Sequence, residues 1–312
     1  MMGKVNFFVV GAPKCGTTTL YHFLNAHGQV DFGRIKEPHL FATDLTLKGS
    51  PSQSRYHASY DFSDPQTRIF GDASVMHLYS ADAAENIKRY HPSAKILIMV
   101  RSPVGFIQSY HHEQLYNQIE DRQSLQECWN LSERRQNGVS VPARCPDGRL
   151  LDYKSIARFD VQIQRFIERF PPDQVRIGFL DDMHGKEDRF IAALYSFLDI
   201  DPDGRSALER LGASKSYKRS WHRELIKIAT NPRLQAIWKT CKRWLGINRR
   251  LRMVRQFRVR TTVSGEKLSI SEALASEIAE HYSENWAGVQ RLAVDYGLLN
   301  RQENDGDGRN AI

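Results

Sequence analysis

A glycine-bounded loop near the N-terminus holds the first residues whose types and spacing could do chemistry. In the stretch GAPKCG, residues 11–16, Lys14 lies between two glycines, and Thr17, Thr18 and Thr19 follow directly. An apolar run precedes the loop, and apolar residues at helical spacing follow it. A tight turn from a strand into a helix gathers free backbone N–H groups and the positive end of the helix dipole at one point. We therefore predict a phosphate-binding loop here.

The position of the lysine distinguishes this loop from the loop of ATP and GTP enzymes. Their pattern is G-x-x-x-x-G-K-[ST], in which the lysine after the second glycine reaches the β- and γ-phosphates beside Mg²⁺. Here position 17 is threonine and the lysine lies inside the loop. A P-loop kinase acting on a small molecule is an alternative, but it would also need a Mg²⁺-binding carboxylate after a core strand. The stretch KILIMVR ends instead in Arg101.

A second pattern suited to phosphate binding occupies residues 95–109. The apolar run KILIMV predicts a central parallel strand, and Arg101 follows at its carboxyl end, where open parallel sheets bind ligands. Ser102 and Pro103 suit a helix start, which places Ser109 two turns into that helix. A guanidinium and a hydroxyl placed in this way can hold a phosphate separate from the one at the loop. Two separate phosphates indicate a bisphosphorylated nucleotide rather than ATP.

Strand and helix patterns alternate along the chain. This alternation predicts an α/β fold: a P-loop-like three-layer sandwich with a central parallel sheet and helices on both faces. We expect one domain over residues 1–300 and a disordered polar tail over residues 301–312. The predicted strands are residues 5–10, 68–71, 95–100 and 175–180 with a short one near residue 30, and the predicted helices are 16–27, 81–90, 103–118, 152–170, 187–199, 221–245 and 270–297, the last two broken.

Composition describes an ordinary globular protein. The 312 residues are 41% hydrophobic and 26% charged, and no apolar run reaches the length of about 18 residues that a membrane span needs. Because the first strand begins close to residue 1, we expect no signal peptide and a cytoplasmic location. Four cysteines lack metal-ligand spacing, and reduced thiols are favoured over a Cys128–Cys145 disulfide.

The positive charge of the chain indicates an anionic partner. The net charge of +8 suits nucleotides, acidic glycans, membrane surfaces and nucleic acid alike. Because no zinc-finger spacing or RNA-binding signature occurs, we do not expect a nucleic-acid partner.

Three stretches resemble a known family, the sulfotransferases that use 3′-phosphoadenosine 5′-phosphosulfate (PAPS). GAPKCGTTTL (11–20) is similar to their 5′-phosphosulfate loop, and RSPVGFIQSY (101–110) to their 3′-phosphate motif. KEPHLF (36–41) resembles the segment of the heparan sulfate sulfotransferase branch whose glutamate is the general base. The family's E-x-L before a late helix is matched weakly by DDM, residues 181–183. The resemblance is to the bacterial type of the family; it is strong over residues 5–41 and 69–118 and thinner to about residue 200.

The resemblance assigns roles on the donor side. It implies that Lys14 stabilises the oxygen between sulfur and the departing phosphate, and sulfuryl transfer of this kind needs no metal. A late loop grips the nucleotide in this family, and the stretch 212–222 is the candidate here, although it lacks the Lys-Gly-Arg triplet of the heparan sulfate branch. The implied PAPS-binding residues are Lys14, Cys15, Gly16, Thr17, Thr18, Thr19, Arg101, Ser109, Lys215, Lys218 and Arg219.

The resemblance also assigns an acceptor side. Glu37 is the expected general base, and His39 could orient Glu37, contact the acceptor or merely fill space. Asp72 and Ser74, after the strand at 68–71, match the family's acceptor-side segment.

Two histidines are rival bases, because the cytosolic branch of the family uses a histidine. His111 falls on a predicted buried stripe with Val104, Ile107 and Leu115, which favours a structural role, and His112 follows it.

The resulting hypothesis is a sulfotransferase that moves a sulfuryl group from PAPS to a hydroxyl, rather than an amine, on a carbohydrate or glycolipid. The alternatives are the kinase described above and a non-catalytic nucleotide-binding or membrane-surface protein.

The segment 225–267 mixes basic and apolar residues without an acidic residue before Glu266. This mixture suits peripheral contact with an anionic membrane, a groove for an acidic glycan, or a solvated basic face.

Overall fold

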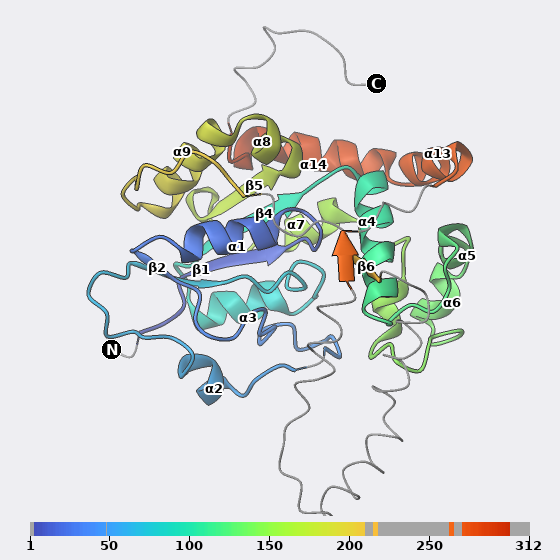
Figure 1. The fold of residues 1–312 in the computed structure, drawn as a ribbon, viewed down its shortest axis with the longest axis horizontal. Helices are drawn as coiled ribbons and strands as arrows, with labels where there is room; N and C mark the ends of the chain where they lie inside the picture. The colour runs from blue at the N-terminus through green and yellow to red at the C-terminus, as the bar shows by residue number, and fades with distance from the viewer. Residues whose placement is uncertain (1–2, 48, 210–214, 218–261, 265–269, 300–312) are drawn as a thin grey trace, which may run out of the picture.

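Five parallel strands form the central sheet of the protein (Figure 1). The computed structural model describes residues 3–47, 49–209, 215–217, 262–264 and 270–299. The strand order is β2-β3-β1-β4-β5, so the carboxyl ends of all five strands meet at one edge. The strands are β1 (Phe7–Gly11), β2 (Val30–Asp31), β3 (Ile69–Asp72), β4 (Lys95–Val100) and β5 (Val175–Phe179).

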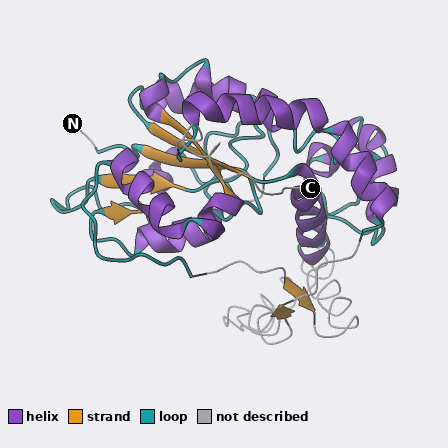
Figure 2. Cartoon of the chain, turned by 90° about the horizontal axis from the view of Figure 1, so that it is seen from above, coloured by secondary structure: helices purple, strands orange, loops and turns teal. Residues whose placement is uncertain are grey.

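Helices cover both faces of this sheet, as Figure 2 shows. The predicted three-layer α/β class is therefore confirmed. The longer helices are α1 (Thr17–Asn25), α3 (Ala83–Tyr90), α4 (Pro103–Tyr116), α7 (Phe159–Ile167), α9 (Glu187–Leu198), α13 (Glu272–His281) and α14 (Ser283–Tyr296). The short ones are α2 (Gln53–His57), α5 (Leu125–Asn130), α6 (Ser132–Gln136) and α8 (Leu180–Gly185), with 3₁₀ segments at Gly148–Leu151 and Pro172–Gln174.

Strands β1 and β4 pair at the centre of the sheet. All five residues of β1 and every residue of β4 after Lys95 are buried, because helices cover both faces. The register runs from Phe7 opposite Lys95 to Val9 opposite Leu97 and then shifts, so that Gly11 lies opposite Ile98. The chain leaves β1 at this shift and enters the loop before α1.

All five predicted strands are confirmed to within two residues, and the predicted break in 270–297 falls at Tyr282. The predicted helix 152–170 is too long at its start, because α7 begins only at Phe159. The backbone N–H of Lys154 donates to the Asp152 carboxylate, and this local turn competes with helix. The predicted helix 221–245 lies outside the described residues.

The predicted buried stripe of α4 is only partly correct. Ile107 is buried, but Val104 and Leu115 are only half-buried. Phe106 and Tyr110 are buried instead, and Phe106 contacts the ring of Phe159 on α7. The helix is enclosed on several sides, so a single stripe at helical spacing does not describe it.

A separate antiparallel pair lies beside α4. Strand β6 (Lys215–Tyr217) pairs with β7 (Thr262–Ser264), and β6 contacts α4 (Figure 1). The chain between these strands, and the predicted tail 301–312, lie outside the described residues. The single-domain assignment of residues 1–300 stays a prediction.

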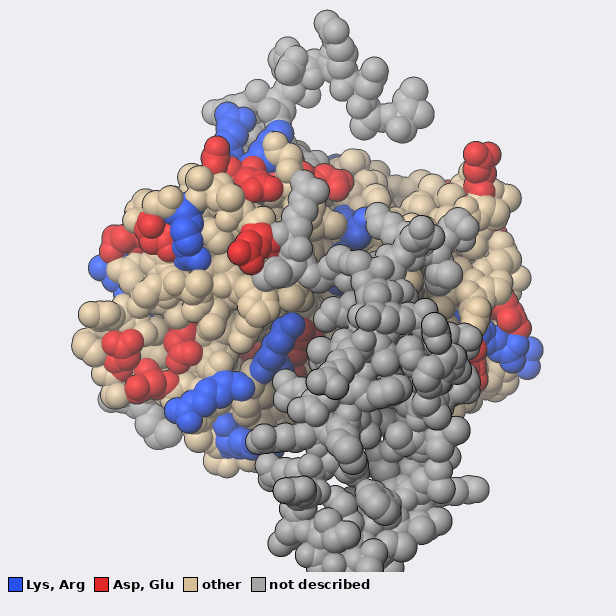
Figure 3. Space-filling model, viewed as in Figure 1, with Lys and Arg blue, Asp and Glu red and all other residues tan. Residues whose placement is uncertain are grey.

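The net positive charge is concentrated in one part of the sequence. Residues 218–261 contain fourteen of the 44 Lys and Arg residues and a single acidic residue, Glu224. On the described surface in Figure 3, basic and acidic side chains are interspersed. Among the described helices, none is long and apolar enough to cross a lipid bilayer. The membrane contact predicted for 225–267 and the cytoplasmic location stay predictions.

A buried ion pair ties the end of α4 to α5 and α6. Arg135 and Glu120 have no exposed side-chain surface, and Arg135 Nη2 lies 2.9 Å from Glu120 Oε1. The Cys128 thiol donates to the same carboxylate at 3.2 Å. Cys145 donates instead to the carbonyl of Asp147, so both thiols are free and the Cys128–Cys145 disulfide does not form.

Glu120→Gln should destabilise the fold strongly, because it leaves the Arg135 guanidinium buried without its counter-charge. We expect a loss of about 3–5 kcal/mol in the free energy of unfolding, measured by denaturant titration. Glu127→Gln is the matched control, since Glu127 pairs with Arg122 at the surface and should cost at most about 1 kcal/mol. Equal effects of the two substitutions would contradict the prediction.

Candidate active site

The loop between β1 and α1 has the geometry of a phosphate cradle. Lys14 and Gly16 have positive φ angles of 64° and 84°, which turn the chain sharply before α1. Gly16 is the N-cap of α1, and no side chain caps the helix. Because glycine has no side chain that could cap the helix, an anion suits the positive end of α1.

A close approach from α8 also requires glycine at position 16. A Cβ built on Gly16 would lie 2.5 Å from the Cε of Met183 and 2.9 Å from the Cδ1 of Leu180. The DDM stretch therefore contributes Met183 as a support for the loop.

The loop side chains differ in what they can contribute. Cys15 is fully buried, and burial raises the pKa of its thiol to about 12, so the group is neutral and only its backbone N–H can meet an anion. Thr17 and Thr19 are buried, whereas Thr18 is half-buried. The Lys14 side chain is 16% exposed.

Arg101 lies against this loop. Its Nη1 is 3.4 Å from the carbonyl oxygen of Lys14, and its guanidinium passes over Gly105, where a Cβ would lie 2.8 Å from Nη2. Arg101 Nε is buried and has no hydrogen-bond partner among the described residues. Ser109, one turn after Gly105, is buried. An unpartnered buried guanidinium nitrogen at the carboxyl end of β4 is a favourable place for an anion.

The predicted base lies in a turn with unusual backbone angles. Glu37 and His39 have φ angles of 51° and 53°. The Glu37 carboxylate is one third exposed, and its oxygens lie 3.6 Å from Lys36 Nζ and 3.7 Å from His39 Nε2. Burial raises the pKa of Glu37 above its ordinary value, Lys36 opposes this rise, and Glu113 and Asp72 add to it. A carboxylate with a raised pKa is a stronger base than an exposed one.

A buried hydrogen-bonded bracket holds this turn. The hydroxyl of Tyr56 and the backbone N–H of Ser74 both donate to Asp72, each at 2.9 Å. The Ser74 hydroxyl then accepts the backbone N–H of His39 at 2.8 Å. Asp72 and Ser74 are 1% and 0% exposed, so in this structure they position the turn. Their predicted contact with the acceptor stays a prediction.

Two neutral histidines lie behind Glu37. The ring centroids of His39 and His77 are 6.1 Å apart, and His77 is fully buried. Burial lowers the pKa of His77 to about 3. Burial and the neighbouring His77 lower the pKa of His39 to about 4, with Asp72 opposing. His39 is therefore neutral at physiological pH, where it can orient Glu37 but carries no positive charge.

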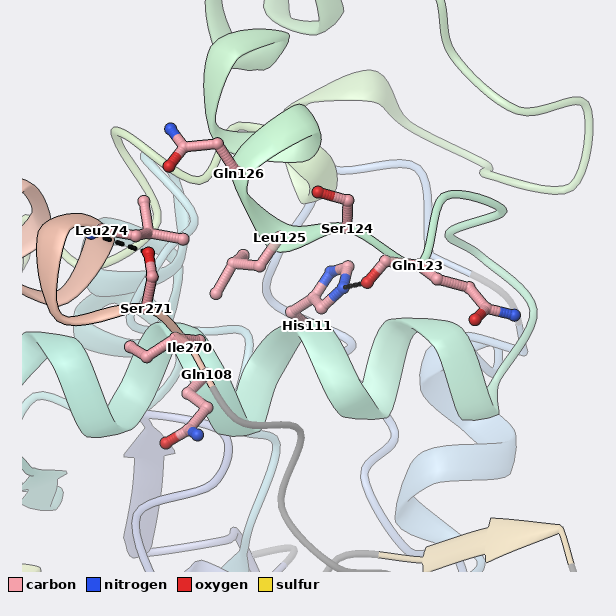
Figure 4. A pocket seen from close by; sticks show the side chains of 9 residues that line it. All are labelled: Gln108, His111, Gln123, Ser124, Leu125, Gln126, Ile270, Ser271 and Leu274. Atoms are coloured by element: carbon pink, nitrogen blue, oxygen red, sulfur yellow. Dashed lines mark hydrogen bonds between the residues drawn. The ribbon is translucent and has the colours of Figure 1, made fainter.

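His111 is held by the fold. Its two ring nitrogens lie 3.0 Å from the Tyr153 hydroxyl and 3.0 Å from the Gln123 carbonyl oxygen. It lines a cavity of about 180 Å³ between α4, α5 and α13, shown in Figure 4, together with Gln108 and Leu274. This cavity contains no residue of the loop. His112 is half-buried.

The structure adds three residues that the motif analysis did not select. Glu113 lies 3.7 Å from Lys14 Nζ, Lys36 pairs with Glu37, and Gly105 underlies Arg101. Glu113 could have been found, because it follows Ser109 by four residues and so shares its helix face.

The late-loop residues are only partly described. The backbone of Lys215 lies in β6 beside α4, whereas Lys218 and Arg219 lie outside the described residues.

Comparison with known proteins identifies the class. Residues 4–225, more than half of the chain, match the sequence model of the sulfotransferase domain. The chain belongs to the sulfotransferase family, as the motifs predicted.

The similar proteins agree with this assignment. Carbohydrate sulfotransferase 15 of Homo sapiens is 25% identical over 32% of this chain and 25% of that protein. The Mus musculus form is 56% identical over 34 residues, 11% of this chain and 6% of that protein. The chain thus matches a quarter or less of the length of these relatives. A sulfotransferase from Alicyclobacillus acidocaldarius shares the fold with a TM-score of 0.58 at 23% identity, over 72% of this chain and 91% of that one.

His77→Phe should make the protein more resistant to acid. With a folded-state pKa of about 3 against the usual 6.5, protonation of His77 does not affect stability above pH 6.5. Below that pH His77 binds a proton in the unfolded chain but not in the folded chain. The free energy of unfolding therefore falls by about 1.4 kcal/mol per pH unit. We therefore expect a shallower loss of the free energy of unfolding between about pH 6 and 4. Exposed His22→Phe is the control, and identical pH profiles for the two variants would refute the prediction.

Proposed function

We propose that this protein is a PAPS-dependent sulfotransferase that sulfates a hydroxyl group of a carbohydrate. The observation that carries the proposal is the contact between Arg101 and the Lys14 loop, because it joins two anion-binding elements at one sheet edge. A donor with a 5′-phosphosulfate and a 3′-phosphate has anionic groups for both elements. Use of PAPS by the sulfotransferase family supports this choice of donor.

The donor residues would bind by charge and by backbone hydrogen bonds. The N–H groups at the start of α1 and the hydroxyls of residues 17–19 would hold the 5′-phosphate, and Arg101 with Ser109 would hold the 3′-phosphate. The bound donor supplies a sulfuryl group on a phosphate leaving group. Lys14 would stabilise the negative charge that develops on the leaving oxygen. Roles for Lys215, Lys218 and Arg219 stay predictions.

Glu37 would take the proton of the acceptor hydroxyl. The hydroxyl oxygen then attacks sulfur in line with the leaving oxygen, and the site contributes mainly by positioning. His39, held through Ser74, would orient the carboxylate. The names of the relatives from Homo sapiens and Mus musculus support a carbohydrate acceptor. Mass spectrometry of products formed from PAPS and cell extract would distinguish carbohydrate from glycolipid and hydroxyl from amine.

The kinase alternative lacks support at two positions. Threonine stands at position 17, where that class needs lysine. The side chain at the end of β4 is the cation Arg101 rather than a Mg²⁺-binding carboxylate.

Adenosine 3′,5′-bisphosphate should bind about tenfold to a hundredfold more tightly than AMP, because only the bisphosphate engages Arg101 and Ser109. Calorimetry with the bisphosphate, AMP and Mg-ATP measures this difference. Equal affinities, or a preference for Mg-ATP, would overturn the proposed donor.

Glu37→Gln should reduce turnover by about a hundredfold or more while leaving bisphosphate affinity nearly unchanged, because the carboxylate acts on the acceptor. Lys14→Ala should also lower turnover more than it weakens bisphosphate binding. Steady-state kinetics with PAPS, beside calorimetry, separates the two effects. The control is His112→Ala, and if that variant loses turnover while Glu37→Gln retains it, Glu37 is not the base.

A further inference from the structure

Glu113 is a carboxylate at the donor end of the site that the proposed mechanism does not use. Its Oε1 lies 3.7 Å from Lys14 Nζ. The Lys14 side chain is 16% exposed and that of Glu113 is 34% exposed. The Lys14 side chain is therefore largely buried, and Glu113 is its only ion-pair partner among the described residues. A largely buried lysine is held more firmly by such a partner than a lysine in open solvent.

The position of Glu113 along α4 relates this ion pair to the donor site. Gly105, Ser109 and Glu113 follow one another at four-residue spacing, so they share one face of the helix, about 6 Å apart along its axis. Arg101 lies over the first of them. The same face thus carries the groups proposed for the 3′-phosphate and, one turn further on, the carboxylate that holds Lys14.

A carboxylate at this point opposes the binding of a polyanion. Lys14 can approach the phosphate–sulfate bridge of a donor only if its ammonium leaves Glu113 or is shared with it. The two negative groups compete for one cation, so the ion pair lowers donor affinity and holds the lysine in place until a donor arrives.

We propose that Glu113 is a positioning residue for Lys14, which it holds in the donor-free enzyme and yields to the bound donor. This inference rests on the proposed function. It assigns no proton transfer or bond to Glu113 itself, because the carboxylate acts through the lysine.

The first test measures bisphosphate affinity. Glu113→Gln should increase the association constant for adenosine 3′,5′-bisphosphate about two- to fivefold, as expected for the loss of one partly exposed ion pair. Glu85→Gln is the matched control, because Glu85 lies on α3 and pairs with Arg89 and Arg169, neither of which is a predicted donor residue. This control should leave the affinity unchanged.

A double-mutant cycle then distinguishes positioning of Lys14 from simple electrostatic repulsion between Glu113 and the nucleotide. If Glu113 acts by holding the lysine, Glu113→Gln should add no affinity in a Lys14→Ala background. A gain that persists without Lys14 would mean that Glu113 only repels anions, and the inference would be wrong. If Glu113→Gln does not increase bisphosphate affinity in the protein that retains Lys14, the inference is also wrong.

The acidic limb of the turnover profile provides a second readout. The charged groups that act on Glu37 are Lys36, Glu113 and Asp72, with neutral His39 beside its carboxylate. Because Glu113 raises the pKa of Glu37, Glu113→Gln should move the acidic limb of kcat/KM to lower pH. Lys36→Gln should move that limb to higher pH. Shifts of the same sign, or none, would contradict the placement of Glu113 beside the reacting groups.

The outcomes also separate this inference from the proposed function. If the unmodified protein binds no bisphosphate, the proposed function fails and the inference fails with it. If bisphosphate binds tightly but the Glu113 and Glu85 variants behave alike, only the role of Glu113 is refuted.

Discussion

The parallel pairing of β1 with β4 is the constraint on which the site depends. Its last rung, from the N–H of Ala12 to the carbonyl of Met99 at 2.6 Å, fixes the beginning of the Lys14 loop against the end of β4. Arg101 leaves β4 two residues later. A slip of one residue would turn every β1 side chain to the opposite face of the sheet. Because both strands are buried, the register that builds the core also places Arg101 against the backbone of the Lys14 loop.

The two sides of the site are built by different means. The donor side depends on backbone groups, on glycines and on buried side chains, all fixed by packing. Gly16 leaves room for Met183, and Gly105 leaves room for the Arg101 guanidinium. The base side is a turn with two positive φ angles, and it is held by one hydroxyl, that of Ser74. The position of Ser74 is fixed in turn by Asp72, a buried carboxylate that accepts hydrogen bonds from the Tyr56 hydroxyl and the Ser74 backbone N–H.

Much of this arrangement could be predicted from the sequence, for identifiable reasons. The strands were predictable because KILIMV and its neighbours are continuously apolar, and the loop because its glycines and lysine are close in sequence. Asp72 and Ser74 were selected from the sequence, but their hydrogen bonds to Tyr56 and His39 could not be predicted, since those partners come from other segments of the chain. Residues 152–158 were misassigned because a side-chain turn at Asp152 outcompetes helix. The predicted α4 stripe was wrong because the buried residues of that helix, which include Phe106 and Tyr110, cover more than one of its faces.

The β6–β7 pair has a consequence for how such a chain can diversify. Tyr217 lies opposite Thr262, so the stretch 218–261 leaves and re-enters the described structure at neighbouring positions. The entropy of closing an excursion whose ends are held together grows only slowly with its length, by about 0.6 kcal/mol per doubling. Insertions, deletions or replacements between these two strands should therefore change the stability of the rest of the fold only slightly. The chain that connects β6 to β7 could therefore vary in length and charge while the edge of the central sheet stays unchanged.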